Sequence, residues 1–146
     1  MKELSWKPVL IEDIQVGMTV SYSQTITDHD IKAFAGLSGD HNPVHVSDAY
    51  IDGSRFKKRV VHGLMPTSFF SGIFGTRLPG PGCLYVSQTV EFKRPIYIDD
   101  TVNAIVEVLE VDLSARHVIF KTTVLVNKKV VIDGAADIFI PKDINC

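Results

Sequence analysis

The sequence lacks the features that mark several large classes of protein. Its 146 residues include only two cysteines, Cys83 and Cys146, which are too few for a disulfide framework. No cysteine–histidine spacing indicates a zinc site, and no glycine-rich phosphate loop of the Walker or dinucleotide type is present. No apolar run reaches the roughly 18 residues that a membrane helix needs. We therefore expect no metal, no cofactor and no membrane insertion.

The sequence also lacks an excess of either charge. Lys and Arg number 15 against 17 Asp and Glu, and the formal net charge of −2 excludes a strongly basic nucleic-acid binder. Residues 1–8 are polar and charged, unlike a signal peptide, so we expect a reduced, cytoplasmic compartment. Hydrophobic residues make up 45% of the chain, which suits the small core of a single domain over residues 1–146.

One short segment, from Asp40 to His45, concentrates groups that can do chemistry. Its Gly-Asp and Asn-Pro steps favour a sharp, non-helical backbone, and Pro43 pushes Asn42 toward extended geometry. This turn can bring the Asp40 carboxylate and the His45 imidazole to one small volume, where the two groups around one water form an acid–base pair. The alternative is a polar loop that caps a helix, because caps and turns use Asp, Asn and Pro for local reasons.

A basic cluster follows this loop. It consists of Arg55, Lys57, Lys58 and Arg59. Such a cluster suits a phosphate-bearing ligand or the acidic surface of a partner protein. The alternative is a solvated basic loop without a ligand.

Residues 60–74 are apolar on nearly every side and predict a buried helix. Pro66 suits its first turn, where a missing N–H does no harm. Gly63 stands at its start, where a backbone N–H can approach a ligand closely and the helix dipole favours negative charge. A simple helix-start glycine is the alternative. His62 either lines the site or is a hydrogen-bonded structural histidine.

The remaining pattern predicts strands and short helices. Alternation over residues 20–25 predicts a strand, and Thr27 with Asp30 forms a capping box for a helix that Gly39 ends. Ser47 can cap another short helix. Four further β runs are predicted, at residues 83–92, 101–111, 117–127 and 130–140. Tight turns between long runs argue for an antiparallel meander, and one helix on such a sheet gives an α+β domain.

These motifs resemble the hydratase signature of the MaoC-like dehydratases and R-specific enoyl-CoA hydratases. The likeness begins at Phe34, Ser38-Gly39-Asp40, Asn42-Pro43 and His45, and it continues through Arg55-Phe56, Val61-His62-Gly63, Pro79-Gly80-Pro81-Gly82, Phe92-Lys93-Arg94-Pro95 and Asp100-Thr101-Val102. Pro66 departs from the family, where a small helix former is expected. The resemblance implies a hotdog fold, with the sheet wrapped around the central helix. It also implies a homodimer joined through sheet edges, which would cover an exposed strand edge.

The resemblance further implies reversible addition of water to a trans-2-enoyl thioester. Asp40 and His45 would activate the water and deliver a proton to C2, while Asn42 helps to hold that water. The Gly63 N–H would stabilise the thioester oxygen as it takes on enolate charge. Substrate-binding residues would be Arg55, Lys57, Lys58, Arg59 and His62, with an acyl-CoA or acyl carrier protein thioester as partner.

Two other functions remain open at this point. One is an acyl-CoA thioesterase on the same fold, in which a carboxylate also activates water but attack falls on the thioester carbon. The other is a non-catalytic protein that binds acyl thioesters. The Asp–Asn–His spacing favours hydration over both.

Overall fold

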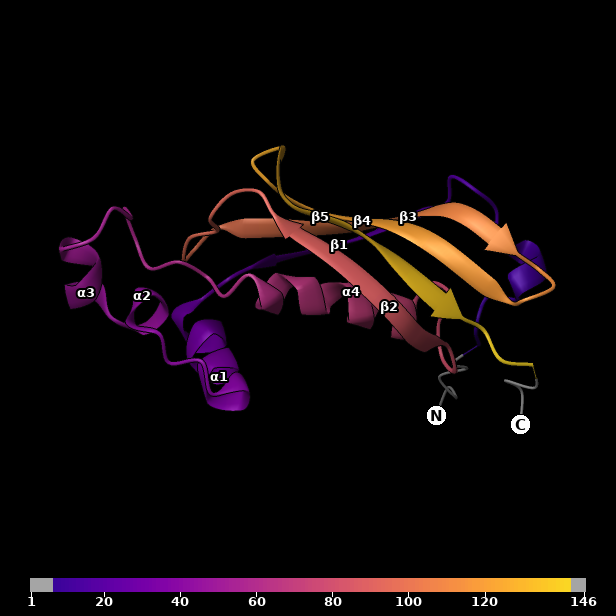
Figure 1. The fold of residues 1–146 in the computed structure, drawn as a ribbon, viewed down its shortest axis with the longest axis horizontal. Coiled ribbons are helices and arrows are strands. Elements are labelled where there is room, and N and C mark those ends of the chain that lie inside the picture. Colours follow the sequence, from indigo (N-terminus) through magenta and orange to yellow (C-terminus); the bar gives the residue numbers. More distant parts are fainter. Residues whose placement is uncertain (1–6, 143–146) are drawn as a thin grey trace, which may run out of the picture.

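A five-stranded antiparallel sheet, with one helix laid along one of its faces, forms the body of the protein (Figure 1). The computed structural model describes residues 7–142. Two features of the sequence analysis lie outside the described residues: most of the N-terminal segment 1–8, judged unlike a signal peptide, and the second cysteine, Cys146. The strands are β1 (Thr19–Thr25), β2 (Leu84–Phe92), β3 (Thr101–Asp112), β4 (His117–Val126) and β5 (Lys129–Phe139). The helices are α1 (Asp28–Ser38), α2 (Pro43–Val46), α3 (Asp48–Asp52) and α4 (Leu64–Thr76), with a 3-10 turn at Ile11–Asp13.

The strand order is β1-β3-β4-β5-β2, which confirms the predicted meander only for β3, β4 and β5. β2 pairs with β5, at the edge of the sheet opposite β1. β2 does not pair with β3, because the connection between these strands, residues 93–100, is too long to be a tight turn. This connection pairs with the segment before α4, where the Ile96 carbonyl accepts a hydrogen bond from the Val61 N–H.

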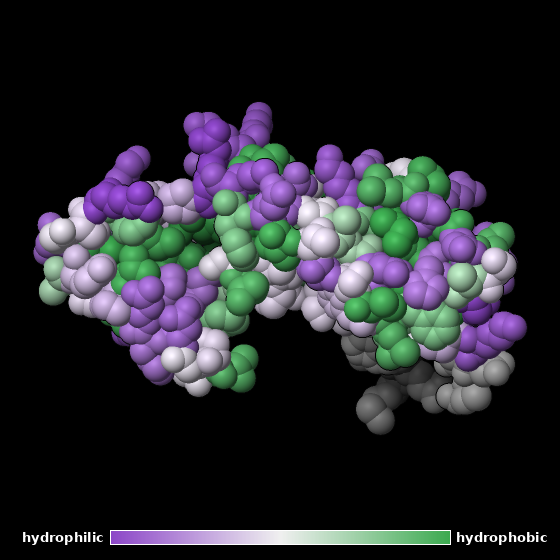
Figure 2. Space-filling model, in the orientation of Figure 1, coloured by the Kyte–Doolittle hydropathy of each residue, from purple (hydrophilic) through white to green (hydrophobic). Residues whose placement is uncertain are grey.

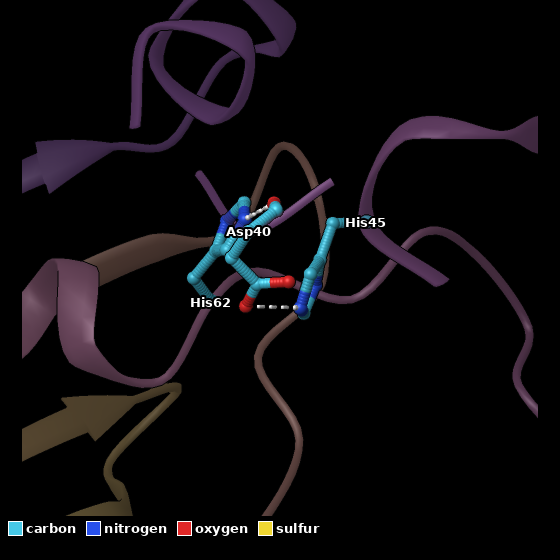
Figure 3. A group of neighbouring side chains, drawn as sticks. All are labelled: Asp40, His45 and His62. Carbon is cyan, nitrogen blue, oxygen red and sulfur yellow. Dashed lines mark hydrogen bonds and ion pairs between the residues drawn. The ribbon is translucent and has the colours of Figure 1, made fainter. Parts of the chain in front are cut away.

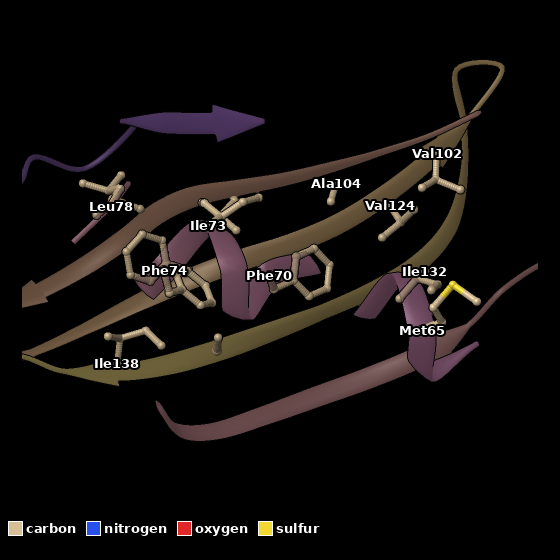
Figure 4. Close-up of a cluster of buried hydrophobic side chains, with 14 of the residues drawn as sticks. Met65, Phe70, Ile73, Phe74, Leu78, Val102, Ala104, Val124, Ile132 and Ile138 are labelled. Atoms are coloured by element: carbon tan, nitrogen blue, oxygen red, sulfur yellow. The ribbon is translucent and has the colours of Figure 1, made fainter. Parts of the chain in front are cut away.

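Period-two alternation decides which side chains of the sheet enter the core. On β3, Val102, Ala104, Val106 and Val108 are buried, and on β4 the buried residues are Val118, Phe120, Thr122 and Val124. α4 covers this face with Met65, Phe70, Ile73 and Phe74 (Figure 4). The Phe74 and Phe120 rings meet at a centroid distance of 4.7 Å, so helix and sheet share one core.

The prediction that α4 is buried on every side is wrong within the single chain. The face of α4 away from the sheet is exposed, at Ser68, Ser71, Gly72 and Gly75. These residues are small and uncharged, so the sequence of the helix shows no charged face to mark its exposed side. Among residues 7–142, no helix is both long and apolar enough to cross a membrane.

The helices α1, α2 and α3 form an arm that extends past one end of the sheet (Figure 1). Local capping sets each helix boundary in the arm. Thr27 and Asp30 make the predicted capping box, and Gly39 ends α1 with a φ of 78°, a left-handed conformation that suits glycine. Asn42 caps α2, and Ser47 caps α3 through the Tyr50 N–H. Short-range hydrogen bonds therefore set where these helices begin and where α1 ends.

Candidate active site

Asp40 lies in the turn between α1 and α2, and three hydrogen bonds hold it there. The Ser38 hydroxyl donates to the Phe34 carbonyl at 2.7 Å and accepts from the Asp40 N–H at 3.1 Å. One carboxylate oxygen of Asp40, Oδ1, accepts from the Asn42 N–H at 3.1 Å. The other oxygen, Oδ2, is left to face the side chain of His45.

His45, on α2, directs one ring nitrogen at Asp40. Its Nδ1 lies 2.6 Å from the Val60 carbonyl oxygen, and because a carbonyl only accepts, Nδ1 carries the proton. Nε2 therefore faces Asp40 Oδ2, at 3.6 Å (Figure 3). This distance exceeds a normal direct hydrogen bond, and a water beside the pair can contact both atoms.

Behind this pair lies His62, which is only 3% exposed. Its Nε2 is 2.9 Å from the Asp40 carbonyl oxygen, and its ring stacks on that of His45 with centroids 3.8 Å apart. Burial away from water lowers the pKa of the His62 imidazole below its usual value. A buried ring has no surface to offer a ligand, so the direct substrate contact expected for His62 does not fit this structure.

Asp40, His45 and His62 also offer three potential metal-binding atoms within 4.8 Å of one another. Their orientation does not suit one ion. The lone pairs of an imidazole lie in its plane, and two rings stacked at 27° direct them nearly parallel rather than toward a common point. The arrangement suits proton transfer at Asp40 Oδ2 and His45 Nε2.

Gly63 precedes the first residue of α4 and lines a cavity of about 690 Å³ together with His45. Within residues 7–142, no hydrogen bond occupies the Gly63 N–H. Its backbone is ordinary right-handed helix, with φ −58°, so conformation does not demand glycine here. The limited space beside it does demand glycine, because an added Cβ would lie 2.6 Å from Cε1 of Phe92. A backbone donor at a helix N-terminus therefore adjoins the cavity that His45 lines.

The basic cluster does not act as one unit. Arg55 is exposed and lines the cavity, and Lys57 and Lys58 are also exposed. Arg59 is different, because its guanidinium is buried.

The contacts of the Arg59 guanidinium lie within the arm. They run to the Asp28 carboxylate at 2.5 Å, the Asp48 carboxylate at 3.2 Å and the His45 carbonyl at 3.3 Å. Because these partners use its charge, Arg59 is not free to bind phosphate, and its predicted substrate contact does not fit the structure. Instead it ties α1 and α3 to the backbone of His45.

Asn42 is also used locally. Its Oδ1 accepts from the Val44 N–H at 3.2 Å and so caps α2. The amide nitrogen and the second lone pair of Oδ1 are left to hold a water, so this cap is compatible with the role expected for the side chain.

The cavity lining includes residues that were not identified as candidates from the sequence, and three of them lie next to one another in the chain. They are Phe92, Lys93 and Arg94. Their motif was part of the family resemblance, but nothing in it indicated a place beside Arg55. That place depends on the pairing of residues 93–100 with the segment before α4.

The chain is similar to known hydratases and dehydratases over most of its length. It is 46% identical over 130 residues to an (R)-specific enoyl-CoA hydratase of Rhodospirillum rubrum, covering 89% of this chain and 90% of the relative. It is 32% identical over 132 residues to a mitochondrial 3-hydroxyacyl-[acyl-carrier-protein] dehydratase of Arabidopsis thaliana, covering 88% and 78%. The solved structure of the R-hydratase PhaJ1 from Pseudomonas aeruginosa matches with a TM-score of 0.87 at 37% identity, covering 92% and 86%.

The structural match confirms the predicted hotdog fold. The family model described as a MaoC like domain matches residues 12–131, which span the arm, α4 and most of the sheet. Both the acid–base loop and the helix that begins after Gly63 fall inside this range. The chain therefore belongs to the MaoC-like domain family.

Proposed function

We propose that the protein catalyses the reversible, R-specific addition of water to trans-2-enoyl thioesters, as a hydro-lyase. One observation carries this proposal most directly. Asp40 Oδ2 and His45 Nε2 face each other at 3.6 Å, and His45 lines the same cavity as Gly63, whose N–H is unoccupied in the described residues. Water activation and stabilisation of an enolate oxygen need such an arrangement.

In the hydration direction, a water between Asp40 and His45 loses a proton to one of them as its oxygen bonds to C3. A proton from the pair then reaches C2, which completes the addition. The electrons displaced from the C2–C3 double bond pass through the thioester oxygen, where negative charge develops. The Gly63 N–H and the N-terminal end of the α4 dipole stabilise that charge. Dehydration follows the same steps in reverse.

The substrate carrier is a phosphate-bearing or acidic group. Arg55, Lys93 and Arg94 all line the cavity, and Lys57 and Lys58 lie close to Arg55 in the chain. Coenzyme A presents phosphates and an acyl carrier protein presents carboxylates, and both are attracted by such a set of cations. Either carrier fits the cytoplasmic location expected from the sequence.

Crotonyl-CoA provides the direct test. We expect the enoyl absorbance to fall when the protein is added, with no release of free thiol. Thiol release would instead indicate a thioesterase. Neither change, across a series of acyl chain lengths on both carriers, would support a non-catalytic binding protein.

The exposed lysines should act on substrate binding alone. We expect the double variant Lys57→Glu/Lys58→Glu to raise KM about 5-fold at low salt, since exposed charge contacts are each worth a fraction of a kcal/mol. The kcat should change little, because these contacts are equal in the ground and transition states. The increase should shrink as salt rises.

The matched control is Lys121→Glu/Lys142→Glu, which changes the net charge equally. Both control residues are exposed, and Lys121 lies on the sheet face away from α4. Steady-state kinetics at two salt concentrations compare the two double variants. An unchanged KM for the Lys57 and Lys58 variant at low salt would show that these residues belong to a solvated loop without a ligand.

We also propose that the protein is a homodimer joined along β2. This strand is an edge of the sheet and is exposed along most of its length, with apolar side chains at Leu84, Tyr85 and Val86. Hydrophobic groups are exposed over this part of the molecule (Figure 2). Long apolar edges invite pairing with another chain. Light scattering should therefore give about twice the chain mass of 16.2 kDa.

A charge placed on this edge should weaken the dimer. We expect Val86→Glu to shift the protein toward monomer at micromolar concentration, because burying an unpaired carboxylate is costly. Leu113→Glu is the matched control, since Leu113 is similarly exposed at 58% against 51% but lies in the turn between β3 and β4. A fully active wild-type monomer would contradict the dimer.

A further inference from the structure

The ring of His62 lies between two others where the arm meets the body. The Phe34 ring, from α1, meets it edge-on at a centroid distance of 4.9 Å. On α2, the His45 ring stacks on it at 3.8 Å. His62 itself directly precedes Gly63 and α4. One buried side chain therefore contacts both helices that flank the acid–base loop.

The peptide groups on either side of the Asp40 Cα are both fixed, and His62 fixes one of them. The Asp40 N–H is held by Ser38 Oγ at 3.1 Å, and its carbonyl is held by His62 Nε2 at 2.9 Å. With Oδ1 of the side chain bound to the Asn42 N–H, the direction of Oδ2 follows from these three contacts. Loss of the His62 contact would free the backbone on the C-terminal side of Asp40.

His62 also limits how the His45 ring can turn. His45 is tethered at Nδ1 to the Val60 carbonyl, and the His62 ring covers one of its faces. Val60, His62 and Gly63 belong to one short segment. That segment thus tethers His45, covers its ring and supplies the free N–H at the start of α4.

The hydrogen bond of His62 determines which of its nitrogens carries the proton. A carbonyl only accepts, so Nε2 is protonated, and Nδ1 is a buried atom with no partner among the described residues. A second proton on Nδ1 would create a charge without solvent or a counter-ion in contact. The titratable groups that face the ring are Asp40, His45 and His41. A neutral ring with its only proton engaged does not relay protons, so its contribution is geometric.

We propose that His62 is a positioning residue that sets the separation of Asp40 Oδ2 and His45 Nε2 at which the two groups share one water. It acts on Asp40 through the hydrogen bond to its carbonyl and on His45 through ring stacking. This inference rests on the proposed hydration reaction for its effect on rate. Its geometric part can be measured without any reaction.

Two variants separate the two contacts. His62→Phe keeps a flat ring against His45 and loses the donor to Asp40, whereas His62→Gln keeps an N–H donor and loses the stacked ring. Each should lower kcat for crotonyl-CoA by roughly 10- to 100-fold, because small displacements of catalytic groups have effects of this size. KM should stay within about twofold, since a buried ring does not touch substrate. His29→Gln, at an exposed histidine in the first turn of α1, is the control and should match the wild type.

Nitrogen-15 spectra of the histidine side chains give the readout that is independent of activity. In the wild-type protein at neutral pH we expect a neutral His62 protonated at Nε2, and a His45 ring with a proton on Nδ1. In His62→Gln, the ring signals of His45 should broaden, because the stacked ring no longer limits how the His45 ring turns. A wild-type His62 that is protonated at Nδ1, or that carries a charge, would overturn the inference even if neither variant folds.

The kinetic measurements distinguish a positioning role of His62 from a substrate contact, and both from a failure of the proposed function. Folded His62 variants with wild-type kcat, beside an inactive Asp40→Asn, would overturn the positioning role and leave the hydratase function standing. A raised KM with unchanged kcat would make His62 a substrate contact instead. A wild-type protein without hydration activity would contradict the function, while the spectra would still decide the geometry.

Discussion

Asp40→Asn is expected to slow hydration by about a hundredfold or more, the usual scale for an acid–base group. The variant suits the test because asparagine keeps the oxygen that accepts from the Asn42 N–H, so the turn should keep its shape. What it loses is the basic oxygen that faces His45 Nε2. A fall in kcat with little change in KM would therefore report chemistry rather than folding.

His45→Ala should cause a loss of the same size, but it also removes the tether to Val60 and the stack on His62. His45→Gln is the closer comparison, since an amide N–H can still donate to the Val60 carbonyl. Both variants should be slow if Nε2 exchanges the proton. Enoyl absorbance at saturating crotonyl-CoA, with circular dichroism for the fold, gives the measurement. Near-full activity in a folded Asp40→Asn or His45→Ala variant would make the acid–base assignment wrong.

Features that depend on a few neighbouring residues could be predicted from the sequence. The capping box of Thr27 and Asp30, the end of α1 at Gly39 and the cap at Ser47 all match the structure. Each involves atoms no more than four residues apart in the chain. The approach of Asp40 to His45 belongs to the same class, because the turn that creates it lies between them.

Features that depend on distant segments could not be predicted in this way. In the sequence, Arg59 resembles its lysine neighbours. In the structure its guanidinium pairs with Asp28, which is 31 residues away in the chain. β2 leaves the meander because residues 93–100 form a long connection that hydrogen-bonds to the segment before α4. The same connection brings Lys93 and Arg94 to the cavity. Composition and spacing carry no information about such contacts, since the partner is set by the folded topology.

Gly63 combines the two cases, and its contact with Phe92 changes how its role must be tested. The sequence placed this glycine at the start of the helix, where an open N–H is a local property. The contact with Phe92 could not be predicted from the sequence, and its ring would lie 2.6 Å from an added Cβ. Gly63→Ala is therefore no mild control, because it keeps the donor but creates a clash.

Removing Phe92 resolves this difficulty. The side chain is 55% exposed, so Phe92→Ala should open space beside Gly63 without leaving a cavity in the core. The informative comparison is then between two double variants. One is Gly63→Ala/Phe92→Ala, which retains the N–H, and the other is Gly63→Pro/Phe92→Ala, which lacks it.

The proline variant is expected to be slower than the alanine variant by about 100- to 1000-fold in kcat, the usual loss for one oxyanion donor. The effect should fall on kcat more than on KM, because the charge on the thioester oxygen develops only toward the transition state. The backbone at Gly63 accepts proline, since its φ of −58° lies close to the value that the proline ring imposes. Stopped-flow or steady-state loss of enoyl absorbance measures the ratio, with Asp40 and His45 unchanged in both proteins. Equal rates in two folded double variants would place the oxyanion contact at another donor along the cavity.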